Sequence, residues 1–470
     1  MYPEAETEAS FSFPQEGPRE YRAEGECTVG GAHAFILRVR YRKSHRYDSR
    51  RASWAVRVSP AASLYSYILV TVLVAGTVCG LCAEVRAGTA ASPRMASQTA
   101  QLVSACDVLV VTLTAAAAVY HAPERMRIII MLKIGFMSQV DESIGAHFSR
   151  SRERRVIGVM LAILVFFTLL VADDFCFYAL QAKKIDRHWE VVRNYCGFYL
   201  LWFVVIVLEL QFAFTALSVR ARFRALNDAL ALTADHLCRP GNYFPVEKTN
   251  DQGALNVFAF HVCARSRRNT APPSRRNHLI VRRGFYTFTF RCLKRGGGRG
   301  QLAVPAGEAL ERLAVLQGAL CEALHRLDAA YGLPLALLLI STLMHLIVTP
   351  YFFIMEIIVS VHRIHFLVLQ FLWCATHVLR ILVVVEPCHY TITEGRRTAE
   401  LVCRLLRAVS SGRGSMLGGR LDLFSRQLSL QSVCYSPMGF CTLGRPLVAS
   451  IFGAVTTYLV ILIQFQRYDA

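Results

Sequence analysis

Long apolar stretches separated by short charged ones run through most of the chain. Seven of these stretches are long enough to cross a bilayer core of about 30 Å. They lie near residues 63–83, 102–121, 156–180, 197–219, 332–359, 366–386 and 447–466. Their length, together with a hydrophobic content of 54%, is typical of a membrane protein rather than a soluble one. The pattern predicts an all-α membrane protein with seven transmembrane helices.

Four further stretches have the pattern of amphipathic helices, and we expect them to pack into a cytoplasmic layer that anchors the bundle. They lie at 220–237, 307–331, 398–409 and 421–430. The predicted organisation is an N-terminal segment 1–62, helices one to four in 63–219, cytoplasmic helices around a disordered insert 240–306 within 220–331, helices five and six in 332–386, anchor helices in 387–446 and the seventh helix in 447–466.

The distribution of basic residues predicts the orientation. The chain has 52 Lys and Arg against 33 Asp and Glu. Residues 38–57 hold eight basic side chains and one acid, and residues 265–299 hold eleven basic side chains and no acid. Basic loops mark the cytoplasmic side, so we expect a cytoplasmic N-terminus and an extracellular C-terminus, without a nucleic-acid partner. The insert at 265–299 reads as a solvated disordered loop, as a site for phosphoinositide or another partner, or as an unspliced stretch.

The sequence has no motif that indicates catalysis, metal binding or cofactor binding. Fifteen cysteines occur without regular spacing and without companion histidines, so no metal site is expected. No nucleophile–base pair or phosphate loop stands out, and we expect neither catalysis nor a cofactor. Cys176 and Cys196 lie near the outer ends of spans three and four, where they either form a disulfide or remain free thiols. The first 60 residues lack a signal-peptide core, so no N-terminal cleavage is expected.

Polar side chains within the spans are the candidate functional residues, because each needs a partner, water or a ligand in the membrane. They are Asp107, Asp173, Asp174, Glu209, Thr342, His345, Thr349, Glu356, Gln370, Trp373, His377 and Arg380. Gln370, Trp373 and His377 recur at i, i+3 and i+7, and the fifth span repeats this spacing. Two such stripes on consecutive antiparallel helices can face each other across a cavity.

A cavity of this kind would suit a small polyol, whose hydroxyl groups hydrogen-bond and whose C–H face packs on an aromatic ring. We predict ligand contacts at Thr349, Gln370, Trp373, His377, His345, Asp107 and Asp173. The alternative is that these groups satisfy one another in hydrogen bonds between helices. Arg380 lies in the inner half, where we expect it to pair with an acid or a helix carbonyl.

The last span ends in an unusual way for a helix that faces lipid. Thr457, Ile461, Gln464 and Tyr468 share one helical face. A primary amide that faces lipid costs several kcal/mol, in the range of about 2–7 kcal/mol, so this face needs water or protein. It predicts a helix that lines a pore or a bundle interior.

The same segment resembles the insect gustatory receptors. Thr457-Tyr458, five hydrophobic residues and Gln464-Phe465 match the signature of that family's last helix, and the resemblance extends over residues 421–465. Residues 344–357, followed by Leu369-Gln370-Phe371-Leu372-Trp373, look most like the fructose-receptor branch. The basic insert and the weakly apolar second span depart from the family pattern.

The resemblance implies a homotetrameric, ligand-gated, nonselective cation channel in the plasma membrane of a sensory neuron. Its partners would be a small-molecule tastant, monovalent and divalent cations, and membrane lipid. Gln464 and Phe465 would form the gate, and Thr457 and Ile461 would continue the pore lining. The fructose-receptor pattern places ligand contacts at Thr349, Gln370 and Trp373.

Other interpretations stay open at this point. A channel of the same family gated by a bitter tastant would have a larger and more aromatic pocket. A G-protein-coupled receptor needs the opposite topology, and the chain lacks the Asp-Arg-Tyr and Asn-Pro-x-x-Tyr motifs. A secondary transporter usually shows an internal repeat, which we do not find here.

Overall fold

The computed structural model describes residues 60–88, 98–132, 150–237, 306–358, 364–410 and 416–469. Within these ranges the chain is helical apart from short turns and the segment 431–444, and seven helices are long and apolar enough to cross a membrane. The expected all-α fold with seven spans is therefore confirmed. Most of the N-terminal segment and the basic insert at 265–299 lie outside the described residues.

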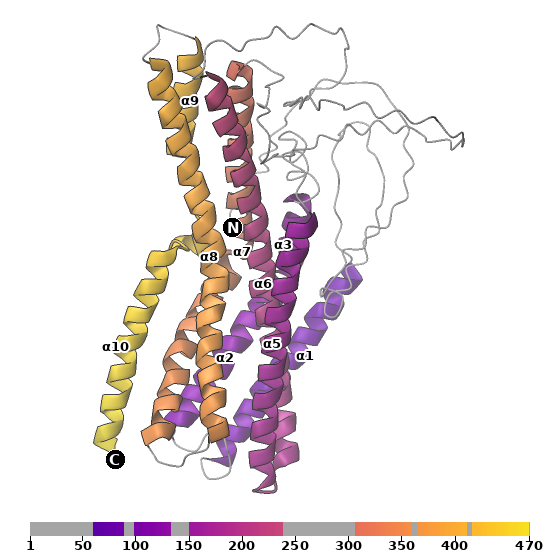
Figure 1. Ribbon diagram of the computed structural model, residues 1–470. Helices are drawn as coiled ribbons and strands as arrows, with labels where there is room; N and C mark the ends of the chain where they lie inside the picture. The colour runs from indigo at the N-terminus through magenta and orange to yellow at the C-terminus, as the bar shows by residue number, and fades with distance from the viewer. Residues whose placement is uncertain are drawn as a thin grey trace, which may run out of the picture.

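The helices differ greatly in length (Figure 1). They are α1 (Pro60–Ala87), α2 (Gln98–Tyr120), α3 (Ala122–Met131), α5 (Arg150–Lys183), α6 (His188–Leu237), α7 (Ala306–Ile358), α8 (Ile364–Ser410), α9 (Met416–Leu430) and α10 (Arg445–Asp469), with a 3-10 turn at Pro437–Gly439. The short α3 directly follows α2 and was not expected from the sequence.

Helices α6, α7 and α8 form a tall central bundle that continues beyond the length of a membrane span. The amphipathic stretches expected at 220–237, 307–331 and 398–409 are uninterrupted extensions of these helices. Their apolar faces are buried, as the full burial of Leu313, Leu320 and Leu327 illustrates. Helical hydrogen bonding has no reason to stop at a membrane surface when an apolar face can still be buried. The predicted boundaries at 219, 331 and 386 thus fall inside continuous helices.

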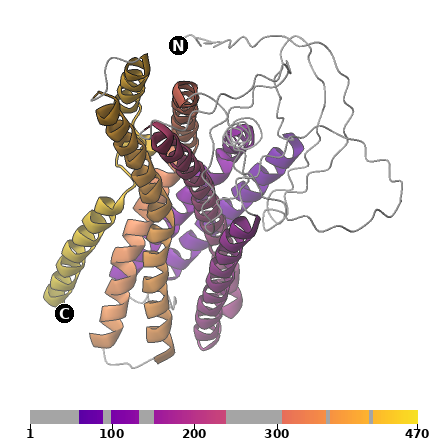
Figure 2. The same ribbon diagram turned by 45° about the horizontal axis from the view of Figure 1, so that its top comes forward.

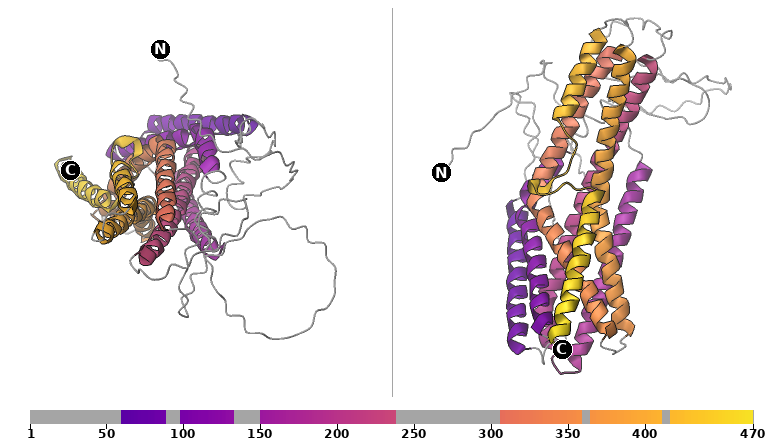
Figure 3. Two further views of the ribbon diagram at one scale, coloured as in Figure 1. Left: turned by 90° about the horizontal axis from the view of Figure 1, so that it is seen from above. Right: turned by 90° about the vertical axis from the view of Figure 1, so that its left-hand side faces the viewer.

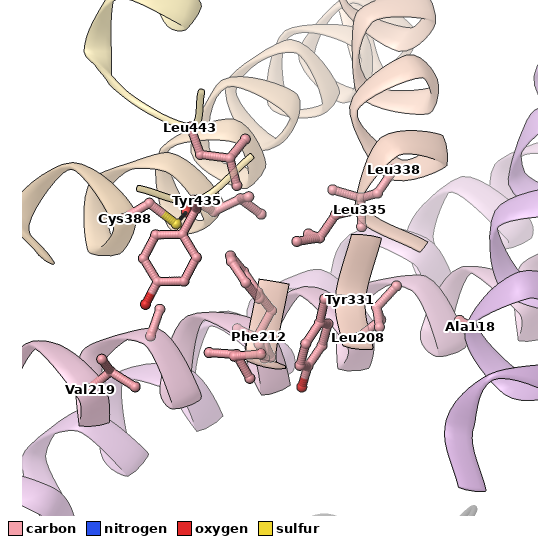
Figure 4. Close-up of a cluster of buried hydrophobic side chains, with 14 of the residues drawn as sticks. Ala118, Leu208, Phe212, Val219, Tyr331, Leu335, Leu338, Cys388, Tyr435 and Leu443 are labelled. Atoms are coloured by element: carbon pink, nitrogen blue, oxygen red, sulfur yellow. Dashed lines mark hydrogen bonds between the residues drawn. The ribbon is translucent and has the colours of Figure 1, made fainter. Parts of the chain in front are cut away.

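A cluster of aromatic side chains packs in the middle of the bundle (Figure 4). The rings of Phe212 on α6 and Tyr331 on α7 lie 5.1 Å apart, and Tyr435, which follows α9, lies 5.9 Å from Phe212. The carboxylate of Asp328 accepts two bonds from the backbone N–H of Ser436, at 3.0 and 3.1 Å. These contacts hold the segment between α9 and α10 against the bundle and so determine where α10 begins.

Two peripheral layers flank the bundle (Figures 2 and 3). Helices α1 and α2 lie side by side on one flank and contact α6. Helix α10 runs along another flank and contacts α7 and α8 along one face only. Its attachment consists of Ile451 and Val455 packed against Leu346, Ile381 and Val385. The C-terminal end of α10 lies at the same end of the bundle as the last turn of α7 and the first turn of α8, and α9 lies at the opposite end (Figure 1).

Candidate ligand site and pore helix

The candidate site is a belt of aromatic and charged side chains inside the bundle, and α8 provides its central stripe. Gln370, Trp373, His377 and Arg380 follow one another at spacings of three and four residues, which places them on one face of the helix. All four are buried. The predicted stripe on α8 therefore faces the bundle interior and not lipid.

His345 on α7 connects this belt to α2. Its Nε2 lies 2.5 Å from Oδ1 of Asp107, and its Nδ1 contacts the carbonyl oxygen of Ser341. A carbonyl oxygen can only accept, so Nδ1 must carry a proton. This contact places a polar pair inside the apolar bundle, at the junction of α2 and α7.

Four rings meet at the centre of the belt. The His345 and His377 rings lie 4.7 Å apart, and Trp373 stacks on His377 at 5.5 Å with an interplanar angle of 22°. Trp202 of α6 lies 4.8 Å from His345 and 5.6 Å from Trp373. The polar stripes of α7 and α8 thus face each other, but their rings are in contact where the sequence predicts a cavity between them.

Trp373 also has a polar partner. Its indole Nε1 donates to Oδ1 of Asp174 at 3.2 Å, and the Tyr199 hydroxyl group donates to Oδ2 of the same carboxylate at 2.5 Å. Asp174 is buried, so these two bonds stabilise its charge in the bundle. They also fix the plane of the indole ring, which leaves little freedom for Trp373 to rotate.

At the end of the α8 stripe Arg380 pairs with Glu209. Two guanidinium nitrogens donate to Oε1 of Glu209, at 2.6 and 2.9 Å, and the guanidinium group stacks over Trp202 at 4.7 Å. The expectation that Arg380 has a structural acidic partner is confirmed. Its Nη1 also lies 3.3 Å from Nδ1 of His377, which must accept this bond, so His377 is the neutral tautomer with its proton on Nε2.

Beside this ion pair lies a small crevice between α5, α6 and α8. It is lined by Ile163, Phe166, Phe167, Ile206, Glu209, Thr376, Leu379, Arg380 and Val383. The second carboxylate oxygen of Glu209 is buried and has no hydrogen-bond partner among the described residues. The crevice has room for little more than one water molecule, which would satisfy this oxygen.

The remaining candidates have different positions. Thr349 and Gln370 are buried, whereas Asp173 is half exposed and contacts His365 at 3.2 Å. Asp173 therefore lies at the rim, and its neighbour Asp174 occupies the interior. Cys176 and Cys196 are both free and exposed on the bundle surface, so the alternative of free thiols is the one that the structure supports.

Two residues of the belt were missed in the sequence. Tyr199 bonds to Asp174 and Trp202 packs against Trp373, yet both residues lie in an apolar run in which Glu209 is the one charged side chain. The signal was present in their spacing, since Tyr199, Trp202 and Glu209 are three and seven residues apart and share a face. The described residues contain no group of three metal-ligating side chains.

Helix α10 differs from α8 because its polar side chains are exposed and not buried. Ile451 and Val455 are buried, whereas Thr457, Ile461 and Gln464 are exposed on a face that no other described helix covers. These are the residues for which the sequence predicts a pore lining. The helix continues through Phe465, whose side chain lies outside the described part of the chain. An exposed amide in an apolar helix indicates that this face meets water or another copy of the chain.

Comparison with known proteins agrees with this arrangement. The sequence profile of the family described as 7tm Chemosensory receptor matches residues 45–468. The Gustatory receptor for sugar taste 43a of Drosophila melanogaster is 28% identical over 415 residues, which is 86% of this chain and 90% of that protein. Putative gustatory receptor 28a of the same organism is 29% identical over 203 residues, or 40% of this chain and 44% of that protein.

Solved structures show the same fold. The insect olfactory receptor OR5 from Machilis hrabei superposes with a TM-score of 0.55 and 11% identity over 91% of this chain and 93% of the other. The same receptor in complex with eugenol gives a TM-score of 0.55 over 92% and 94%. A match that covers almost the whole sequence, on a seven-span helical fold, leads to one conclusion. The chain belongs to the 7tm chemosensory receptor family and is a multi-pass membrane receptor.

Proposed function

We propose that this receptor is a sugar-gated, nonselective cation channel in which four copies surround one pore. The likeness to a receptor for sugar taste over most of both chains supports the ligand class. The observation that carries this proposal is the position of Trp373 inside the bundle, where the indole bonds to Asp174, stacks on His377 and lies one turn along α8 from the buried Gln370. An aromatic face surrounded by fixed donors and acceptors matches the C–H face and hydroxyl groups of a sugar.

The contacts within the belt indicate how binding would act. Trp373 stacks on His377 of the same helix, and His377 lies against His345 of α7, so a sugar that displaces His377 from the indole also changes the contact between His377 and His345. A change in this contact moves α8 relative to α7, and α10 packs on both helices. The ligand opens the pore to the extent that it binds the displaced arrangement more tightly than the closed one.

In this proposal α10 lines the pore. Thr457 and Ile461 face the conduit, and Gln464 with Phe465 forms the gate near its extracellular end. The exposed amide of Gln464 supports this role, since amides can replace part of the hydration of a passing cation. The N-terminus and the α9 end would be cytoplasmic, as the basic segments favour.

Electrical recording from cells that express this chain alone tests the proposal, with sugars and bitter compounds applied in turn. We expect a current evoked by a sugar, with fructose the first candidate. Trp373→Ala should raise the half-maximal sugar concentration at least about tenfold, because it removes both the stacking face and the donor to Asp174. Phe371→Ala is the matched control, because this aromatic side chain is 61% exposed on the outer face of the same helix.

Two outcomes would overturn parts of the proposal. Silence to every sugar together with a response to an alkaloid would assign the receptor to bitter tastants and leave the channel intact. An extracellular N-terminal tag in intact cells would reverse the orientation and reject the channel arrangement. Trp373→Phe separates the two roles of the side chain, since it keeps an aromatic face and removes only the indole N–H.

A further inference from the structure

Three side chains from three helices meet where α10 begins. Arg220 on α6 follows the apolar stretch of its span, Tyr390 on α8 lies four residues beyond residue 386, and Arg445 is the first residue of α10. The guanidinium carbon of Arg220 lies 4.2 Å from the centre of the Tyr390 ring. That of Arg445 lies 5.7 Å from the same point. Two cations thus share one aromatic ring.

The charges at this position do not balance. Arg445 donates to both oxygens of Glu386, at 2.9 and 3.1 Å, and its Nη2 reaches the Tyr390 hydroxyl oxygen at 3.5 Å. Among the described residues no carboxylate lies within ion-pair distance of Arg220, whose contact is the Tyr390 ring. With Glu386 assigned to Arg445, one positive charge remains uncompensated, and His389 beside Glu386 adds to it when protonated.

The position also lies at the level where apolar sequence ends on all three helices. Arginine and tyrosine at such a boundary reach the polar headgroups while their apolar parts stay in the membrane. Tyr390 is 38% exposed and the Arg445 side chain is 56% exposed, so both are accessible from outside the bundle. The Tyr390 hydroxyl group accepts from Arg445 and donates to the Glu386 carboxylate, so an incoming acceptor would compete with Glu386 for the Tyr390 proton as well.

We propose that Arg220, Tyr390 and Arg445 bind the phosphate group of an anionic membrane lipid. The phosphate accepts from both guanidinium groups and from the Tyr390 hydroxyl group, and its charge compensates the unpaired one. It competes with Glu386 for the donors of Arg445. Lipid binding and the Arg445–Glu386 ion pair therefore oppose each other at the joint between α8 and α10. If α10 lines the pore, as proposed above, lipid at this joint shifts the balance between closed and open channels.

Binding of a fluorescent phosphatidic acid to the purified full-length chain in detergent tests the site without any current measurement. Anisotropy should show specific binding that excess phosphatidylcholine does not displace. Arg220→Gln should weaken binding about tenfold, the loss expected for one charge-assisted hydrogen bond. Tyr390→Phe should weaken it several-fold. Glu386→Gln should have the opposite effect and strengthen binding, because it removes the competing carboxylate.

Arg404→Gln is the control for bulk charge. Arg404 is exposed on α8, fourteen residues beyond Tyr390 and so about 21 Å further along the helix. Equal weakening by Arg220→Gln and Arg404→Gln would overturn the site. Displacement of the lipid by millimolar inorganic phosphate would assign the site to free phosphate and overturn the lipid assignment. Should Arg220→Gln fail to fold, the opposite signs expected for Tyr390→Phe and Glu386→Gln still decide the question.

Discussion

Helices α6 and α10 have nearly the same apolar character, yet the fold uses them in opposite ways. In the apolar window of α6, 61% of the residues are buried inside the chain, whereas in that of α10 the share is 11%. Helix α6 contacts α1, α2, α5, α7 and α8, whereas the main contacts of α10 are with α7 and α8. Apolar composition therefore places both in the membrane and does not distinguish a central helix from a peripheral one.

Their polar residues make the distinction. On α6, Tyr199 and Glu209 have partners within the same chain, at Asp174 and Arg380. On α10, Gln464 is exposed and Thr457 bonds only back to its own helix, at the carbonyl of Gly453. A polar group satisfied within the chain belongs to the core, and one left exposed in an apolar helix points to water or to another subunit. Substitutions in the two helices and in their neighbours test this difference, in order of decreasing expected change.

The largest effect is expected at the ion pair that α6 makes with α8. Glu209→Gln should destabilise the protein by about 3–5 kcal/mol, because it leaves the Arg380 charge buried without compensation. Replacement of both partners, Glu209→Leu with Arg380→Met, should recover most of the loss. The stability of both variants is measured by thermal unfolding, with the folded fraction at each temperature read by size-exclusion chromatography.

Glu322→Gln is a matched control for this experiment. Glu322 pairs with Arg326 on the exposed surface of α7, at 2.7 Å with both side chains more than half exposed. Its removal should change stability by no more than about 0.5 kcal/mol. If Glu209→Gln proved equally mild, the buried pair would not be a structural element of α6.

A smaller effect is expected where α1 packs on α6. A Cβ atom added at Gly80 would lie 2.2 Å from the backbone oxygen of Asn194, and the Asn194 side chain donates to the buried Glu84 at 2.8 Å. Gly80→Ala should therefore destabilise by about 1–3 kcal/mol through overpacking. Gly76→Ala, one turn earlier with open space around it, should instead stabilise by up to about 1 kcal/mol through helix propensity. Two equal melting temperatures would contradict the close approach of α1 to α6.

These residues also show what the sequence can predict. The seven spans, the inward stripe on α8 and the polar face of α10 follow from apolar length and helical spacing, whereas the choice of Glu209 as the partner of Arg380 comes from the structure alone. The choice between Asp173 and Asp174 does not follow from the sequence either, because adjacent residues point about 100° apart and only packing fixes the rotation of the helix. The sequence likewise gives no sign that Trp202 would sit at the centre of the belt, since an indole in an apolar run has the same pattern whether it meets lipid or rings.

The continuity of the long helices was the other feature that the sequence did not reveal. Hydropathy falls at residues 219 and 386, and the expected boundaries followed it. Beyond those points the helices bury apolar faces against one another, and Asn227 and Thr398 link α6 to α8 with a hydrogen bond of 2.6 Å between their side chains. Such a bond depends on residues 171 positions apart, which local periodicity cannot register.

The smallest change in stability is expected on the exposed face of α10. A substitution there is the most direct test of the difference between α6 and α10. Ile461→Ala should alter the stability of the purified protein by less than about 0.5 kcal/mol, because the side chain is 38% exposed and has few packing partners to lose. Its expected effect is on conduction instead, as a higher basal current through a wider and less apolar pore.

Val455→Ala is the matched control on the packed face of the same helix. It should cost about 1–2 kcal/mol for two buried methyl groups and leave the open conductance unchanged. If the two substitutions gave the same loss of stability and no change in current, the face of α10 that carries Thr457, Ile461 and Gln464 would not line a conduit, and α10 would be a peripheral membrane helix only.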